Sequence, residues 1–225
     1  IEEVSEEVRR EERVVSWLGD RLYVPSTIIS VEEEGKIYRL MKRIRGKDLS
    51  SPSFLENPER LLDLCAEAYE KLSNVDISDC PSCRSLDFCL KEAEERVEKN
   101  LVDVEDTDPS TFGKGGFSSP EKLLEWLMDN KPKEEKSFIH GDFCLPNIIL
   151  GENGNIGVID LGRSGVGDKY NDIALLSRSL KSNFSGHYNG GKQYPGYREE
   201  MLYERLGIRK DEEKVRYYLL LDELF

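Results

Sequence analysis

The sequence predicts an α+β fold in which a few short strands accompany a mainly helical chain. Apolar residues recur at helical spacing through much of the chain after residue 57. Two strand-like runs near the N-terminus, and two apolar runs on either side of Asn153-Gly154, interrupt this helical pattern. With 225 residues, the chain can bury the core of one large domain or of two modest ones.

The N-terminal part is expected to form one helix and a pair of strands. Residues 2–18 are expected to form the helix, whose apolar stripe consists of Val4, Val8, Val15 and Leu18. Strands are expected at about 27–32 and 36–41, joined through Glu33-Glu34-Gly35. The segment up to about residue 44 is too small to be a domain by itself.

Helices fill most of the remaining chain. Asn57-Pro58 supplies a capping side chain and a proline at the first helical position. Further helices are expected over about 85–100, from Ser119-Pro120 to Leu127, and over 171–181, 199–206 and 211–224. Two loops are expected among them: residues 103–116, acidic and then glycine-rich, and residues 185–196, on the surface.

The composition is typical of a folded globular protein, because 38% of the residues are apolar and 34% are charged. No apolar run approaches the roughly 20 residues that cross a bilayer, and the first residues lack the apolar region of a signal peptide. Cys80-Pro-Ser-Cys83 has no second cysteine pair or histidine cluster to complete a zinc site, which favours reduced thiols. These observations predict a cytoplasmic protein without a membrane partner.

The formal net charge of −13 argues against nucleic acid as the partner, because binding to phosphates requires a basic surface. Such an acidic protein could instead attract a polycationic small molecule. The acidity could equally serve only to keep the protein in solution. Charge alone leaves both interpretations open.

Residues 140–160 carry the groups that predict the chemistry. Phosphoryl transfer needs a carboxylate beside the acceptor hydroxyl and oxygen ligands for Mg²⁺. Asn153-Gly154 predicts a hairpin with a type I′ turn, in which residue 152 pairs with 155. Asn147 would then lie opposite Asp160, at about 4.5–5.5 Å, so that both could bind one metal ion. Asp142 would lie on the loop that leads to Asn147.

This pattern resembles the catalytic segment of protein-kinase-like enzymes, with His140-Gly-Asp142 for His-Arg-Asp and Asp160-Leu-Gly162 for Asp-Phe-Gly. Over essentially its whole length, the chain is similar to aminoglycoside 3′-phosphotransferases of the kanamycin/neomycin kinase type. The runs that carry this similarity are Glu11, Trp17-Leu18, Val24-Pro25, Asp76–Pro81, His140–Asn147, Ile159–Val166, Asp168–Ala174 and Leu219–Phe225.

The resemblance implies a protein-kinase-like fold with a mostly helical C-terminal lobe at 45–225. Residues 1–44 would be the remnant of a truncated N-terminal lobe, without the first strands and the nucleotide lysine. It implies transfer of the γ-phosphoryl group of ATP, with Mg²⁺, to the 3′-hydroxyl of a cationic aminoglycoside, by a monomer or homodimer. A kinase of a choline- or homoserine-like hydroxyl, or an inactive fragment that binds the drug, remain alternatives.

The resemblance also assigns roles to residues. Asp142 would be the catalytic carboxylate, Asn147 and Asp160 the Mg²⁺ ligands, and Glu11 the partner of the nucleotide lysine. The hinge at Lys42 and Ile44 would hold the adenine edge, and Ile149 and Ile159 would pack on its ring. The substrate-binding residues would be Arg163, Arg178, Glu223 and the terminal carboxylate of Phe225, with Asp106 and Asp108 as looser candidates.

Several of these residues have a simpler structural interpretation. Glu11 could lie on a solvated helix face, Arg163 and Arg178 could pair with nearby carboxylates, and Glu223 could be a surface residue. Two further residues are expected to be architectural. Asp172 would brace the catalytic loop through main-chain hydrogen bonds, and His140 would be a hydrogen-bonding residue rather than an acid or base.

The glycine-rich phosphate loop of such enzymes has no counterpart in this chain. Gly113-Lys-Gly-Gly116 lies in the wrong region and is more simply a flexible loop. We therefore expect residues 1–225 to be weakly active or inactive alone, and the gene to encode about 35–50 further N-terminal residues, the usual size of such a lobe by family resemblance. Robust ATP-dependent phosphorylation of kanamycin by residues 1–225 would contradict this expectation.

Overall fold

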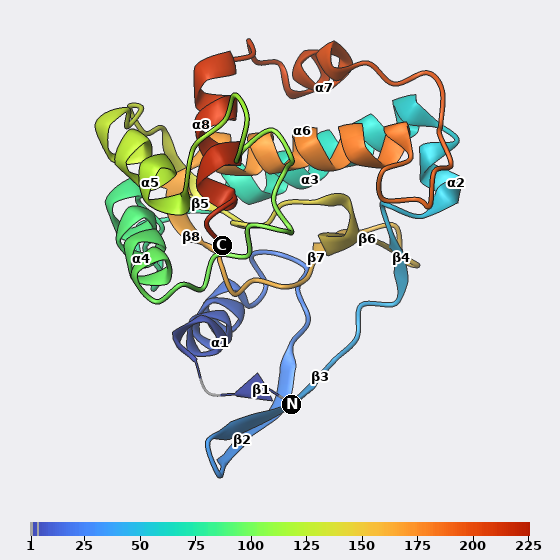
Figure 1. Cartoon of the computed structure of the whole chain (residues 1–225). Coiled ribbons are helices and arrows are strands. Elements are labelled where there is room, and N and C mark those ends of the chain that lie inside the picture. The colour runs from blue at the N-terminus through green and yellow to red at the C-terminus, as the bar shows by residue number, and fades with distance from the viewer. Residues whose placement is uncertain (1, 4) are drawn as a thin grey trace.

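The computed structural model describes residues 2–3 and 5–225. Helices form most of the molecule, and the N-terminal segments lie together below them in the view of Figure 1. The elements, in chain order, are β1 (Glu2–Glu3), α1 (Glu6–Leu18), β2 (Thr27–Glu33), β3 (Lys36–Met41), β4 (Gly46–Asp48), α2 (Pro52–Leu55), α3 (Pro58–Ser73), α4 (Leu86–Glu98), α5 (Pro120–Asp129), β5 (Lys136–Ile139), the 3-10 turn η1 (Leu145–Asn147), β6 (Ile148–Gly151), β7 (Ile156–Val158), β8 (Gly165–Asp168), α6 (Lys169–Ser185), α7 (Glu199–Leu206) and α8 (Glu212–Asp222).

The predicted first helix is partly wrong, because it begins at Glu6 rather than at residue 2. The Ser5 hydroxyl accepts a hydrogen bond from Val8 N at 3.2 Å and caps the helix there. Glu2 and Glu3 instead pair with β3 in an antiparallel ladder. Val4, which was assigned to the apolar stripe, lies outside the described residues.

The other predicted helices and the two N-terminal strands are confirmed, with small changes at their ends. Asn57 caps α3 by accepting from Arg60 N at 3.2 Å, as expected. The helix predicted at 171–181 is longer, since Asp168 caps it at Lys169 and it runs to Ser185. Among the described residues, no helix is both long and apolar enough to cross a membrane.

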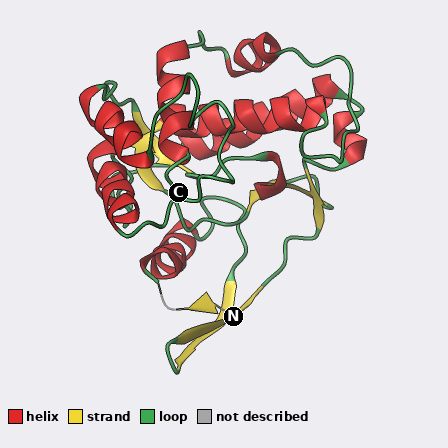
Figure 2. Cartoon of the chain, viewed as in Figure 1, coloured by secondary structure: helices red, strands yellow, loops and turns green. Residues whose placement is uncertain are grey.

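The strands form three small sheets, in the orders β1-β3-β2, β4-β6-β7 and β5-β8. Figure 2 shows that they occupy a minor part of a mainly helical molecule. In the β2–β3 hairpin, Glu33 pairs with Lys36, so Glu34 and Gly35 alone form the turn. Both have positive φ, 51° and 74°, as a two-residue type I′ turn requires.

Two clusters of buried apolar residues make up the core. The first surrounds α3 and the C-terminal half of α6, and the second lies between α4, α5, α6 and α8. Val14, Val15 and Leu18 of α1 belong to the first cluster. The ring of Trp17 also lies 5.6 Å from that of Phe138 in β5. Burial of these side chains anchors α1 on the helical body through the hydrophobic effect.

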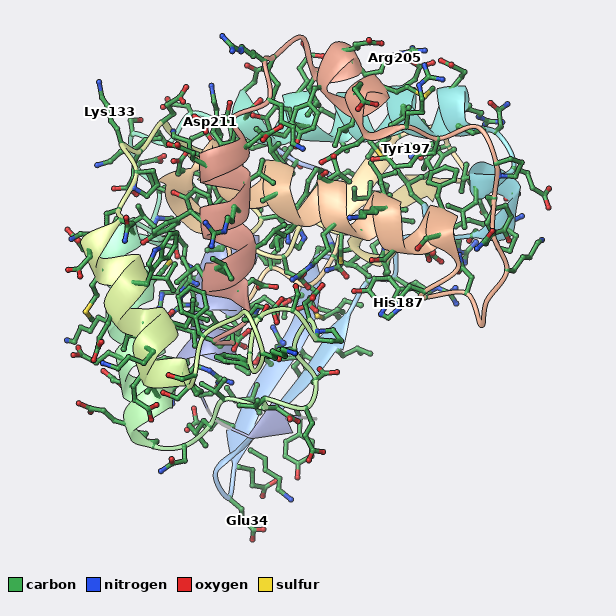
Figure 3. The ribbon with its side chains drawn as sticks, turned by 45° about the horizontal axis from the view of Figure 1, so that its top comes forward. Glu34, Lys133, His187, Tyr197, Arg205 and Asp211 are labelled. Atoms are coloured by element: carbon green, nitrogen blue, oxygen red, sulfur yellow. The ribbon has the colours of Figure 1, made fainter. Side chains whose placement is uncertain are left out.

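The segment at 185–196 was predicted to be a surface loop, and from Gly186 onward it is a loop in which most residues are exposed. His187 and Tyr188 are exposed, but Tyr194 is buried in the first core cluster. Tyr197 stacks on Phe184 with ring centroids 4.6 Å apart. The aromatic side chains tie the segment to the body, as the position of Tyr197 in Figure 3 illustrates.

Candidate active site

The β6–β7 hairpin has a register that differs by one residue from the predicted one. Leu150 pairs with Ile156, and Gly151 N donates to Asn155 O at 2.9 Å, which leaves a three-residue loop at 152–154. Gly154 has a φ of 80°, whereas Asn153 is not among the described non-glycine residues with positive φ. The predicted type I′ turn is therefore wrong. The Asn153 side chain accepts from Asn155 N at 3.1 Å, and this local bond favours the longer loop.

The new register places Asn147 opposite Ile159 rather than Asp160, and Ile159 N donates to Asn147 O at 3.0 Å. The predicted direct pairing of Asn147 with Asp160 is thus also wrong. Asp160 follows the strand and has a φ of 62°, in the left-handed region. Such a conformation costs on the order of 1 kcal/mol for a residue other than glycine. It also ends the extended backbone, in which side chains point alternately to the two faces of the sheet.

Asp142 and Asn147 are in direct contact. The Asn147 side-chain amide donates to both the main-chain oxygen and the carboxylate Oδ2 of Asp142, at 2.9 Å each. Asn147 is buried in η1, and Asp142 is half-buried on the loop before it. Because the amide nitrogen is engaged by Asp142, the amide oxygen is the end of Asn147 that can bind a cation.

Cys144 lies on the same loop, between Asp142 and Asn147. Burial, and to a smaller extent the negative charges of Asp142 and Asp160, raise the pKa of its thiol to about 12. The thiol is therefore protonated at neutral pH and is a poor nucleophile. Asp160 comes directly after Ile159, whose N donates to Asn147 O, so it lies one residue beyond the strand end that pairs with Asn147.

A buried carboxylate braces the catalytic loop. Asp172 in α6 accepts from His140 N at 2.7 Å and from Gly141 N at 2.9 Å. Burial raises the pKa of Asp172, although the hydrogen bonds from the two main-chain donors oppose this rise. The predicted bracing role of Asp172 is confirmed.

His140 is fully buried and joins two parts of the site. Its Nδ1 accepts from Asp142 N at 3.3 Å, and its Nε2 lies 2.8 Å from Ile159 O. Because Nδ1 accepts, Nε2 carries the proton that is donated to Ile159 O. The imidazole therefore links the loop of Asp142 to the strand end before Asp160, which confirms its predicted architectural role.

Glu11 lies on the face of α1 that points toward the segment after Asp160. Its Oε1 accepts from Leu161 N at 3.3 Å, and its Oε2 lies 2.5 Å from the Arg39 guanidinium on β3. Only 13% of the Glu11 side chain is exposed, so the alternative of a solvated helix face is wrong. Its pairing with a nucleotide lysine stays a prediction.

The proposed adenine residues lie near the same hairpin. Residues 42–45 connect β3 to β4, and Arg45 O accepts from Glu152 N at 2.9 Å in the loop of the β6–β7 hairpin. The Ile44 side chain is buried, whereas Ile149 and Ile159 are half-buried and Lys42 is exposed. Their contact with a nucleotide stays a prediction.

The C-terminal end of α8 gathers charged residues from distant parts of the chain. Arg178 pairs with Asp222 and lies 3.4 Å from Glu223 Oε1. Arg163 lies 3.4 Å from Asp222 Oδ1 and 5.4 Å from the centre of the Phe225 ring. The two arginines thus pair with carboxylates, which is the alternative that the sequence left open. Asp222, their common partner, was not predicted, although it adjoins Glu223 in the sequence.

Glu223 is not a surface residue, because only 8% of its side chain is exposed. Burial raises the pKa of its carboxyl, and its Oε2 accepts from Asp108 N at 2.9 Å. Hydrogen bonds from the hydroxyl and the main chain of Ser110 lower the pKa of Asp108. The structure therefore brings Asp108 to this group, whereas Asp106 is exposed and bonds through its main-chain N to Asp103 O.

Arg96 in α4 is a further residue that the sequence did not reveal. Its guanidinium donates to Leu224 O at 2.8 Å and to Phe225 O at 2.7 Å. It therefore holds the last residues of the chain beside Arg163 and Asp222. A single arginine on a helix with many charged residues gives no sequence signal for such a long-range contact.

The comparisons with known proteins agree with this arrangement. A family model described as "Phosphotransferase enzyme family" matches residues 1–202. The chain belongs to this family. It is 36% identical over 219 residues to an aminoglycoside 3′-phosphotransferase of Niallia circulans, a match that covers 97% of this chain and 79% of the relative.

Two solved structures are similar to this phosphotransferase along nearly its whole length. An aminoglycoside 3′-phosphotransferase of type VIII has a TM-score of 0.80 at 27% identity, over 97% of this chain and 80% of that one. The aminoglycoside phosphotransferase APH(3″)-Id of Streptomyces rimosus, in complex with ADP and streptomycin, has a TM-score of 0.80 at 25% identity. That match covers 97% of this chain and 82% of the other. The protein-kinase-like fold predicted from the sequence is thus confirmed.

The oxygen groups of this phosphotransferase fit a magnesium site of the kind that is completed by substrate phosphates. Among the described residues, no three His, Cys, Asp or Glu side chains cluster as a metal-binding group. Mg²⁺ in kinases needs only one or two protein ligands of this type, because phosphates and water supply the others. Asn147, with its amide nitrogen engaged, and Asp160, turned out of the strand, are suited to that role.

Proposed function

We propose that this phosphotransferase transfers the γ-phosphoryl group of ATP to the 3′-hydroxyl of an aminoglycoside and thereby confers resistance to kanamycin- and neomycin-type drugs. The observation that carries the proposal is the Asp142–Asn147 contact, beside the strand end that leads to Asp160. The similarity to an aminoglycoside 3′-phosphotransferase over 97% of the chain supports the choice of substrate and hydroxyl.

Asp142 would orient the acceptor hydroxyl and take its proton late. The hydrogen bond from Asn147 engages Oδ2 and so fixes the carboxylate, whose Oδ1 would accept from the hydroxyl. A loose transition state for phosphoryl transfer demands positioning more than base strength. Asn147 and Asp160 would hold Mg²⁺, which neutralises the charge that develops on the phosphate oxygens.

The nucleotide would lie between the hinge and the hairpin. The main chain at Lys42 and Ile44 would bind the adenine edge, and Ile149 and Ile159 would supply apolar contacts to its ring. Glu11 would pair with a nucleotide lysine. ADP is present in the similar APH(3″)-Id structure, which supports ATP as the donor. Because ATP is the donor, we place the enzyme in the cytoplasm.

The aminoglycoside would bind at the end of α8. Glu223, Asp108 and the Phe225 terminus would face its ammonium groups, since charge-assisted hydrogen bonds favour a polycation there. Arg163 and Arg178 would act by holding Asp222 and Glu223 in place, because both guanidinium groups already pair with carboxylates. Asp106 would contribute only through long-range attraction, since its side chain is exposed.

Substitution of Asp142 tests the proposal. In the Asp142→Asn variant of the enzyme expressed from its full reading frame, we expect kcat for kanamycin to fall by about 10²–10⁴-fold while KM changes little, because the drug contacts lie elsewhere. NMR of the product should locate the phosphate on the 3′-oxygen, and choline and homoserine should not be phosphorylated. Full kanamycin protection by Asp142→Ala in bacteria would instead indicate that the protein only sequesters the drug.

A further inference from the structure

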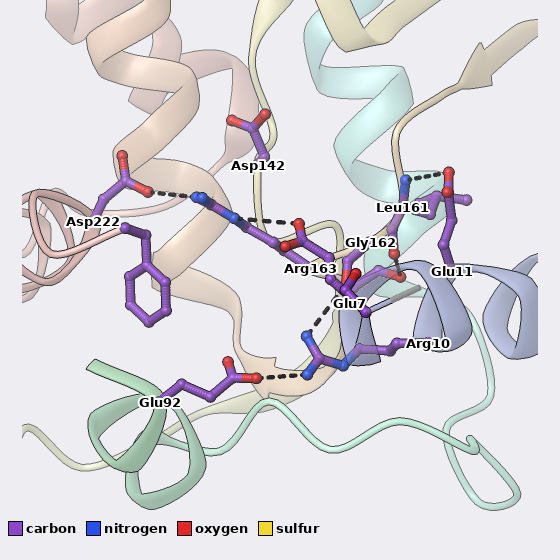
Figure 4. A network of polar contacts seen from close by, with 12 residues as sticks. Glu7, Arg10, Glu11, Glu92, Asp142, Leu161, Gly162, Arg163 and Asp222 are labelled. Carbon is purple, nitrogen blue, oxygen red and sulfur yellow. Dashed lines mark hydrogen bonds and ion pairs between the residues drawn. The ribbon is translucent and has the colours of Figure 1, made fainter. Parts of the chain in front are cut away.

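Helix α1 contacts each of the three residues that follow Asp160. Glu11 accepts from Leu161 N at 3.3 Å, Arg10 donates to Gly162 O at 3.2 Å, and Glu7 lies 3.8 Å from the Arg163 guanidinium. Arg10 and Glu11 lie three and four positions after Glu7, so all three project from one side of the helix, as Figure 4 shows. The fit is close, because a Cβ at Gly162 would lie 2.8 Å from Glu7 Cγ.

Among these contacts, that of Arg10 extends to a second helix. Its guanidinium lies 2.6 Å from Glu92 Oε1 on α4, while Arg84 pairs with the other oxygen of the same carboxylate. Both guanidinium groups also lie over the Phe88 ring, at 5.3 and 5.5 Å from its centre. Arg10 therefore connects the segment after Asp160 to the helical body.

The chemistry of this link requires an arginine. Arg10 and Arg84 are each only 7% exposed, so their hydrogen bonds form away from water and are strong for that reason. A planar guanidinium presents several donors at fixed angles, and Arg10 uses two of its nitrogens for two acceptors at once. A lysine has a single charged atom and cannot span Glu92 and Gly162 in the same way.

We propose that Arg10 is a positioning residue for Asp160, and that it sets the affinity of the site for Mg²⁺. The inference rests on the proposed role of Asp160 as a metal ligand. Asp160 has positive φ, and such a conformation persists only where neighbouring structure holds it. Arg10 stabilises this conformation because it donates a hydrogen bond to Gly162 O, two residues after Asp160, while its guanidinium is held in place by Glu92.

Arg84 provides a matched control within the same cluster. It equals Arg10 in burial, shares the Glu92 carboxylate and covers the same ring, but in the part of the chain that the structure describes its guanidinium forms no hydrogen bond with residues 161–163. The test compares Arg10→Met, Arg10→Lys and Arg84→Met in the enzyme encoded by the complete gene. Three quantities are measured: amide hydrogen exchange of residues 161–164 without nucleotide, the Mg²⁺ concentration at half-maximal rate, and KM for kanamycin.

In Arg10→Met, we expect exchange of residues 161–164 to accelerate and the half-saturating Mg²⁺ concentration to rise on the order of tenfold, as for other partners of metal ligands. Arg10→Lys should change both quantities in the same direction, and KM for kanamycin should be unchanged in both variants. Arg84→Met should lower thermal stability but leave exchange and Mg²⁺ dependence as in the parent. Equal effects of Arg10→Met and Arg84→Met would overturn the proposal, because only packing around Glu92 would then matter.

If Arg10→Met does not fold, the proposal is tested by comparing Arg10→Lys with the parent and with Arg84→Met in the same measurements. Arg10→Lys keeps the buried positive charge beside Glu92. The role of Asp160 is tested separately through Asp160→Asn. Full activity of Asp160→Asn would refute the proposed metal ligand, whatever the exchange data show. A loss of activity in Asp160→Asn, with parental exchange in both Arg10 variants, would refute the positioning role alone.

Discussion

The brace between Asp172 and the catalytic loop allows a quantitative prediction. In Asp172→Asn, one of the two main-chain donors, His140 N or Gly141 N, would face an amide NH₂ group instead of a carboxylate oxygen. A hydrogen bond to a charged group contributes about 1.5–3 kcal/mol, and a buried donor without an acceptor costs a similar amount. We therefore expect the free energy of unfolding to fall by about 3 kcal/mol.

Urea denaturation of the parent and the variant measures this loss through the transition midpoint. Asp211→Asn is the matched control, because Asp211 caps α8 by accepting from Lys214 N at 3.0 Å and asparagine caps a helix equally well. The control should stay within about 0.5 kcal/mol of the parent. A loss in Asp172→Asn no larger than that of the control would refute the brace, as would an unchanged kcat in the variant.

Three further predictions concern other parts of the site. Because burial raises the pKa of Glu223, KM for kanamycin should increase as the pH falls through that pKa and the carboxylate loses its charge. The Glu223→Gln variant should lose this pH dependence, and its KM at neutral pH should be about tenfold higher than that of the parent. A pH dependence of KM that persists in the variant would contradict this role of Glu223. Gly141 has a φ of 84°, and a Cβ there would lie 2.0 Å from Arg163 O, so Gly141→Ala should lower the unfolding free energy by at least about 2 kcal/mol in thermal melts. Iodoacetamide at pH 8 should alkylate the exposed Cys83 well before Cys144, because the Cys144 thiol has a pKa of about 12 and stays protonated. Mass spectrometry measures the rate at each cysteine, and equal rates would argue against the raised pKa of Cys144.

The sequence predicted the elements of the fold well, because their signals are local. Helical periodicity, the Asn57 cap and the strand runs each depend on neighbouring residues, and all three are found in the structure. The hairpin register was wrong because Asn-Gly is compatible with both two- and three-residue loops. The bond from Asn155 N to the Asn153 side chain, which belongs to the longer loop, leaves no trace in an apolar pattern.

The candidate site was predictable where a motif carried it and unpredictable where contacts join distant segments. Asp142 and Asn147 lie five positions apart, and the structure joins them directly. The contacts of Arg96 with Phe225 and of Arg10 with Gly162 each span more than a hundred positions. Such ion-pair and main-chain contacts have no periodic signal, so only the folded chain reveals them.

The anchoring of α1 has a consequence for how the enzyme is controlled. Protein kinases can be switched by moving the helix that carries the glutamate partner of the nucleotide lysine. In the proposed function, α1 is the corresponding helix. Its side chains Val14, Val15 and Leu18 are buried in the main core, so displacing it would expose that core to water. We therefore expect this helix to keep its position whether or not substrates are bound, so that movement of α1 is not the switch of this enzyme.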